Sequence, residues 1–237
     1  MANDMRKTVY LQILLLVLLG KAGSAQLNHV WDNALELEWL DNDRWTAVFA
    51  FDNRAFVEEI FDPEKGDFED TRLDFSFIEV TQEIGYHFNE RYTAGLEVRF
   101  RYESLFNRSE DNEIRLTPFF EYETERNGTT LTSDIRLEQR NYPEATAYRL
   151  KIAQAWSRPF NVDSNKENPL AWFTEQLLAL QYESSVYPEY ELRNEVGIVW
   201  TVLPKLEFEP ALQLRSEYDF EVWDFALFYR TKLKYSF

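Results

Sequence analysis

The last thirteen residues, 225–237, carry the pattern that most restricts how this chain can fold. From Phe225 to Phe237, one parity is almost entirely apolar or aromatic, whereas the other carries Arg230, Lys232 and Lys234. Successive side chains of a β-strand point to opposite faces of the sheet. The stretch therefore predicts a strand with one apolar face and one cationic face.

The same period of two recurs along the chain and predicts a protein built of strands. In the clearest stretch, 92–103, Arg99 and Arg101 share one face and Phe100 lies on the other. If the apolar face meets lipid, a one-residue slip would move each arginine into lipid at a cost of about 2–4 kcal/mol, so the register is strongly specified. The alternation occurs in eleven stretches: 34–40, 45–54, 72–88, 92–103, 114–123, 130–140, 148–152, 172–183, 190–202, 206–218 and 225–237.

Several local features interrupt or end these strands. The acidic stretch 57–71 contains a proline and a glycine, and it predicts an exposed loop. The apolar parity of 72–88 changes partway, which predicts a β-bulge near Phe77. Pro118 departs from its strand pattern because proline cannot donate to a ladder. Asn127-Gly128 is the dipeptide that a tight two-residue hairpin turn prefers.

These stretches predict an all-β fold, an antiparallel up-and-down transmembrane β-barrel. Bacterial single-chain barrels have an even number of strands, so eleven stretches indicate about twelve strands, with ten as the alternative. We expect the twelfth strand in 27–31 or within 157–171, where the polar sequence shows no clear period.

The N-terminal residues 1–25 read as a signal peptide, with a basic start, an apolar middle and a small-residue end. We therefore expect one domain, 26–237, without a lipoprotein anchor or disulfides, because the chain has no cysteine. Removing 1–25 from the 25 basic and 42 acidic residues takes away three of the former and one of the latter. The remaining 22 and 41 give a net charge of -19, which makes nucleic acid an implausible partner.

Strand length and aromatic placement favour a membrane over water outside the barrel. A bilayer needs strands of about 9–11 tilted residues, and amphipathic rings form girdles at its two interfaces. Aromatic residues near predicted strand ends are Trp39, Trp45, Tyr86, Tyr92, Tyr102, Tyr122, Tyr148, Trp200, Tyr218 and Tyr235. The alternative is a secreted, soluble lipocalin-like barrel or β-sandwich that acts as a binding module.

If the apolar faces point outward, the charged faces line the interior, and both signs occur on neighbouring strands. The candidate pore-lining residues are Glu97, Arg99, Arg101, Arg115, Arg136, Glu138, Arg140, Arg149, Lys151, Arg193, Arg215 and Arg230. Opposite charges can pair and fill a small barrel. An incompletely filled lumen would instead select solutes with its charged rings. We weigh these two interpretations equally.

The sequence offers no catalytic, metal or cofactor site. Only His29 and His87 could act as imidazole bases, and neither can be placed in a Ser-His dyad. Carboxylates occur on every strand, which indicates a polar lining rather than a selected acid/base pair. The acidic stretch 62–70 lacks the ordered spacing of a calcium loop. We therefore expect a protein that is not an enzyme.

Three segments resemble the central pattern of a family of small, uncharacterised Gram-negative outer-membrane proteins known only as a domain of unknown function. They are 134–140, 148–152 and 158–160. The resemblance implies a barrel and transfers no catalytic residue. The chain is also similar in size and inward arginines to the narrow oligosaccharide porins, although here acids alternate with those arginines. The strand ending at Phe237 resembles the terminal strand of outer-membrane barrels, which implies recognition by their assembly machinery.

We therefore expect a protein of the cell outer membrane, in contact with its lipid and lipopolysaccharide. The first hypothesis is a narrow passive pore for small, including anionic, solutes. The second is a closed structural barrel with an ion-paired lumen, whose outer loops contact lipopolysaccharide or a partner. An enzyme acting on membrane lipids is a distant third. The sequence leaves the oligomeric state open.

Overall fold

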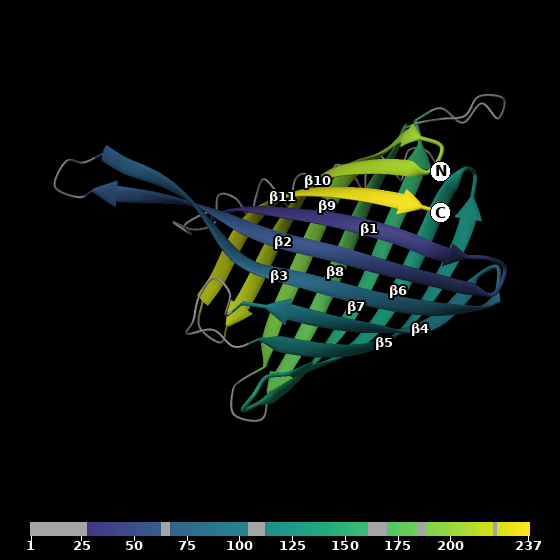
Figure 1. Ribbon diagram of the computed structural model, residues 1–237, viewed down its shortest axis with the longest axis horizontal. Helices are drawn as coiled ribbons and strands as arrows, with labels where there is room; N and C mark the ends of the chain where they lie inside the picture. The colour runs from purple at the N-terminus through teal and green to yellow at the C-terminus, as the bar shows by residue number, and fades with distance from the viewer. Residues whose placement is uncertain (1–27, 63–66, 104–111, 161–169, 184–187, 220–221) are drawn as a thin grey trace.

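The protein is a closed β-barrel, shown in Figure 1. The computed structural model describes residues 28–62, 67–103, 112–160, 170–183, 188–219 and 222–237, so the expected signal peptide 1–25 lies outside them. None of the described residues forms a helix long and apolar enough to cross a membrane. The described strands are β1 (Asn28–Asp41), β2 (Trp45–Asp62), β3 (Asp67–Asn89), β4 (Tyr92–Tyr102), β5 (Glu113–Arg126), β6 (Thr129–Asn141), β7 (Thr146–Pro159), β8 (Leu170–Glu183), β9 (Glu189–Leu203), β10 (Leu206–Asp219) and β11 (Val222–Ser236).

The predicted all-β barrel of about twelve strands is confirmed, and the described residues form eleven strands. Sequential neighbours pair antiparallel, whereas the closing pair, β1 and β11, is parallel. An odd number of up-and-down strands makes the first and last run in the same direction, so closure requires a parallel pair. Residues 28–31, where a separate strand was expected, instead begin β1, and most of 157–171 lies outside the described residues.

The barrel has two different ends. At the turn end, two- or three-residue turns at 42–44, 90–91, 127–128 and 204–205 join the strands. At the opposite loop end, the connections include 103–112 and 184–188. The turn at Asn127-Gly128 is the predicted tight hairpin, and both of its residues have positive φ, 55° and 70°.

The prediction of an exposed loop at 57–71 was wrong. Strands β2 and β3 continue through most of it, with pairs from Val57↔Leu73 to Asp62↔Asp67. Backbone hydrogen bonds extend a ladder whatever the polarity of the side chains, so an acidic composition does not by itself end a hairpin. In Figure 1 this pair extends beyond the rest of the barrel at the loop end.

The predicted bulge near Phe77 is present. Arg54 pairs with Phe77, and the next residue, Ala55, pairs with Phe75, so Ser76 is the extra residue of β3. The bulge changes which parity faces inward: Phe75 is exposed on the outside, whereas Phe77 is buried. It therefore reconciles the two apolar parities of this strand.

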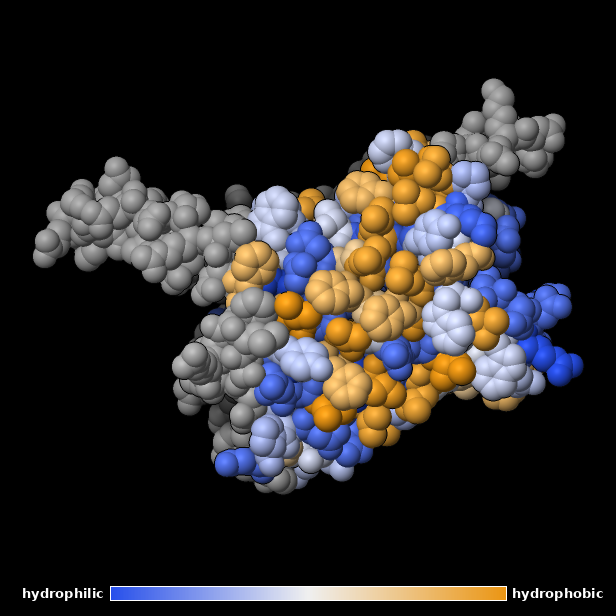
Figure 2. Space-filling view, viewed as in Figure 1, coloured by the Kyte–Doolittle hydropathy of each residue, from blue (hydrophilic) through white to orange (hydrophobic). Residues whose placement is uncertain are grey.

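The outside of the barrel is apolar, and the charged parity faces inward. Figure 2 shows hydrophobic side chains across the strands that face the viewer, with hydrophilic residues gathered at the turn end on the right. Large exposed side chains occur on every strand, including Leu35, Ile84, Leu96, Ile135, Ile152, Leu178, Ile198, Leu212 and Leu233. Among the expected girdle residues, Trp39, Trp45, Tyr92 and Trp200 are exposed near the turn end.

Two glycines of the inner wall each accommodate an aromatic ring from the next strand. Gly95 of β4 pairs with Phe119 of β5, and Gly197 of β9 pairs with Phe173 of β8. A Cβ added at Gly95 would lie 2.2 Å from the Ile84 carbonyl oxygen and 2.5 Å from the Phe119 ring. Pro118, the proline that departed from its strand pattern, has no partner residue on β6 in the β5–β6 pairing.

We predict that Gly95→Ala destabilises the barrel by about 1–3 kcal/mol, because the added methyl group overpacks a site closed by backbone. Gly85→Ala is the matched control, since its nearest contact is the flexible Thr93 side chain at 3.1 Å. Guanidinium unfolding followed by tryptophan fluorescence measures both variants. Equal stability losses would contradict the proposed packing of Phe119 on Gly95.

Candidate functional site

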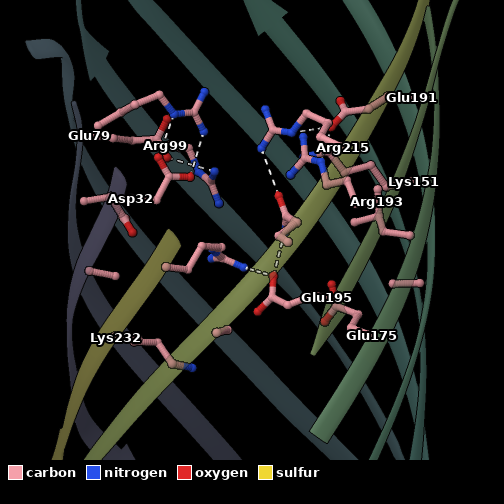
Figure 3. Close-up of a pocket in the computed structure, with 18 of the residues that line it drawn as sticks. Asp32, Glu79, Arg99, Lys151, Glu175, Glu191, Arg193, Glu195, Arg215 and Lys232 are labelled. Atoms are coloured by element: carbon pink, nitrogen blue, oxygen red, sulfur yellow. Dashed lines mark hydrogen bonds and ion pairs between the residues drawn. The ribbon is translucent and has the colours of Figure 1, made fainter. Parts of the chain in front are cut away.

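The inner wall of the barrel encloses a charged cavity of about 670 Å³. Figure 3 shows Glu79 and Arg99 reaching into it from one wall and Arg193 and Glu195 from the opposite wall. Twelve Arg and Lys and ten Asp and Glu side chains line this cavity, an excess of two positive charges. Two more carboxylates, Glu113 and Glu138, lie directly behind the wall and pair with its cations, so twelve carboxylates balance the twelve cations.

Buried carboxylates hold the cations of neighbouring strands together. Glu113, which is 1% exposed, accepts a hydrogen bond from Arg115 at 2.6 Å and another from Arg140. Glu79 pairs with Arg99 at 2.9 Å and with Arg101 at 2.7 Å. A buried ion is strongly destabilising once its partner is removed, so these strands depend on each other's charges.

Aromatic rings join this network across the closing seam. The Arg54 guanidinium lies between the buried rings of Phe77 and Phe228, 4.8 and 4.9 Å from their centroids. Arg101 covers the Phe77 ring at 4.0 Å, and Arg215 covers the Phe228 ring at 4.1 Å. Cation–π contacts of this kind strengthen when water is excluded. The stack therefore connects β4, β3, β2, β11 and β10.

The ion pairs and the aromatic stack form one closed circuit around the lumen, which we call the inner ring. Every consecutive pair of its members is joined by a hydrogen bond, an ion pair or a cation–π contact. In order, it runs through Arg101, Phe77, Arg54, Phe228, Arg215, Glu191, Arg149, Gln181, Arg140, Glu113, Arg115 and Glu79 and returns to Arg101.

The inner ring takes a side chain from every strand from β2 to β11. The remaining strand, β1, is attached to it because Asp32 pairs with Arg54 through two hydrogen bonds of 2.7 and 2.9 Å. The bidentate geometry adds direction as well as energy to that contact. All described strands are therefore linked by side chains inside the barrel as well as by their ladders.

All twelve sequence-predicted residues lie on the inner side of the barrel. Eleven of them line the cavity, and Glu138 is fully buried behind it, where it pairs with Lys151. Five belong to the inner ring: Arg101, Arg115, Arg140, Arg149 and Arg215. The structure brings the others into neighbouring ion pairs, such as Arg136 with Glu97 at 3.0 Å. Their role in a pore is part of the proposal below.

Sequence reasoning missed several members of the site. Glu79 was missed because the bulge at Ser76 shifts the parity of β3. Glu113 directly precedes the apolar stretch of β5, and its shared parity with Arg115 was the signal that could have identified it. Asp32 lies in the part of β1 that showed no clear alternation. Arg54 is the last residue of the predicted strand 45–54, close to the expected loop.

His87 lies between two threonine hydroxyls at the turn end. Its Nε2 is 2.6 Å from the Thr46 hydroxyl, and its Nδ1 is 2.8 Å from the Thr93 hydroxyl. The second histidine, His29, lies in β1. Within the described ranges, no three His, Cys, Asp or Glu side chains are grouped so as to hold a metal ion.

Fold and site together define a closed β-barrel with a charged, ion-paired lumen and an apolar exterior. The chain belongs to the family described as "Protein of unknown function (DUF2490)", which matches residues 38–226. The expected membership of an uncharacterised barrel family is therefore confirmed.

Two further comparisons add little to the family membership. No curated protein matches the sequence. Among solved structures, the siderophore receptor PirA from Pseudomonas aeruginosa is similar with a TM-score of 0.31 and 9% identity, over 78% of this chain and 33% of the receptor chain. The chain thus spans about a third of the length of that receptor, and so distant a likeness carries no argument about function.

We predict that Glu113→Ala lowers the free energy of unfolding by about 3–5 kcal/mol, because it removes the nearest buried carboxylate of both Arg115 and Arg140. Glu217→Ala is the matched control: Glu217 also pairs with an inner-ring arginine, but at 3.8 Å and with its side chain 54% exposed. That control should cost less than about 1 kcal/mol. Chemical unfolding of both variants measures the difference, and equal losses would contradict a structural role for the inner ring.

Proposed function

We propose that this protein is an outer-membrane β-barrel whose lumen is a narrow passive pore for small anionic solutes. The observation that carries the proposal is the cavity inside the barrel, which twelve Arg and Lys side chains line. A volume of about 670 Å³ falls within the range of small-molecule sites. Charged rings in a lumen of this kind can select solutes by sign.

The distribution of side chains supports the membrane location. Water would favour polar residues on the outside of a barrel, whereas the outside of this barrel exposes leucine, isoleucine and aromatic side chains. The described strands contain 11 to 23 residues, enough for the 9–11 tilted residues that a bilayer requires. A closed barrel also leaves no unpaired backbone edge in lipid.

On this proposal, the turn end faces the periplasm and the loop end faces outward, since outer-membrane barrels have short periplasmic turns and longer external loops. The loop end would then meet lipopolysaccharide. Strand β11 would present its end, with Phe237 69% exposed, to the barrel assembly machinery. None of these contacts requires a catalytic residue.

The inner ring supports a second candidate, a closed structural barrel. Its cations are held by carboxylates, Gln181 or aromatic rings, and fully paired charges can fill a small lumen. In that case the external loops, rather than the lumen, would carry the function. The two candidates differ in one measurable property, conductance.

We predict discrete single-channel steps with anion preference when the refolded mature protein is inserted into a planar bilayer. Arg136→Ala and Arg149→Ala should each move the reversal potential in a salt gradient toward zero, because each removes a positive charge from the cavity wall. Lys205→Ala, in an exposed turn outside the lumen, is the matched control and should leave it unchanged. Silence from protein shown to be folded and inserted would overturn the pore and favour the closed barrel.

A further inference from the structure

A row of polar side chains crosses the apolar outside of the barrel on β6 to β9. Ser133 pairs in register with Gln154, Gln154 with Gln176, and Gln176 with Asn194, so the four residues lie side by side on adjacent strands. We call them the amide row. They share the outward parity, because the exposed apolar residues Ile135, Ile152, Leu178 and Val196 lie two positions away on the same strands.

The amide row is only partly satisfied within the chain. Gln176 donates a hydrogen bond to the Asn194 side chain at 3.2 Å. The Gln154 side chain is exposed and makes no hydrogen bond to any described residue. Lipid tails offer no hydrogen-bonding partner, so a primary amide on a lipid-facing surface is unfavourable unless another protein group meets it.

A second outward polar row, at the closing seam, contrasts with it. Thr231 donates to the Asn33 side chain at 2.6 Å, and Asn33 donates to Asn53 at 3.1 Å. These residues lie on β11, β1 and β2 and satisfy one another across the parallel pair. Every member of the seam row therefore takes part in a side-chain hydrogen bond within one chain, whereas Gln154 of the amide row does not.

We propose that the amide row is the centre of a contact between two copies of this chain within the membrane. A side-chain amide both donates and accepts, so Gln154 can pair with the same residue of a second copy across a two-fold axis. The flanking leucine, isoleucine and valine side chains would pack around that contact. Because the barrel is closed, a partner meets it through side chains and not by adding a strand.

This inference rests on the membrane location in the proposed function but not on pore activity.

The chain has no cysteine, so a single introduced cysteine gives an unambiguous cross-link. Gln154→Cys in vesicles of outer-membrane lipid, treated with a mild oxidant, should give a covalent dimer. Ile84→Cys is the matched control: Ile84 is an exposed outward apolar residue on β3, across the barrel from β8, and the variant should stay monomeric.

Light scattering of the detergent-solubilised protein provides the second readout. The unmodified chain should have twice the mass of one barrel, and the Gln154→Leu, Gln176→Leu double variant should fall to the mass of one. Monomeric unmodified protein, or no more cross-linking at 154 than at 84, would overturn the dimer. Flotation with vesicles separates the two failures, because protein that does not co-float contradicts the membrane location itself.

Discussion

The burial of many charges inside a small barrel is the constraint on which the rest of this structure depends. Each arginine of the inner wall loses water on folding, and only a carboxylate, an amide or an aromatic face on a neighbouring strand replaces it. The inner ring meets this requirement around the whole circumference. Breaking it at Glu113 removes the nearest carboxylate of two cations at once, so the wall acts as one unit rather than as separate salt bridges.

The inner ring can form only after the barrel has closed. The contact of Arg54 with Phe228 joins β2 to β11, which lie on either side of β1 and at opposite ends of the chain. The parallel pairing of β1 with β11 and the ion pair of Arg54 with Asp32 meet at the same seam. Ladder and side-chain contacts therefore reinforce each other where an up-and-down barrel of eleven strands must close.

The cost of leaving a polar group unpaired away from water also explains the outside of the barrel and marks the exceptions on it. Outward side chains are apolar, so polar outward residues are conspicuous. Each member of the seam row hydrogen-bonds within the chain, whereas Gln154 of the amide row does not, which is why we propose a second copy rather than lipid as its partner. On the inner wall, twelve cations gather within an acidic chain, and the carboxylates beside and behind them balance their charge.

Much of the fold followed from local patterns, because the alternation of a strand can be recognised from neighbouring residues in the sequence. The register of β4, the bulge at Ser76 and the turn at Asn127-Gly128 were all predictable for that reason. The continuation of β2 and β3 through 57–71 was not, because backbone pairing carried the ladder past a polar composition.

Alternation alone thus determined that the chain is built of strands and that Arg99, Arg136 and their neighbours lie on the polar faces of those strands. Tertiary structure decided how the barrel closes, because the pairing of β1 with β11 depends on the number and shear of all the strands. It also decided which carboxylate each cation meets. Glu79 and Arg115, or Arg140 and Gln181, become neighbours only through the stagger of strands around a closed wall, and no spacing in the sequence encodes that stagger.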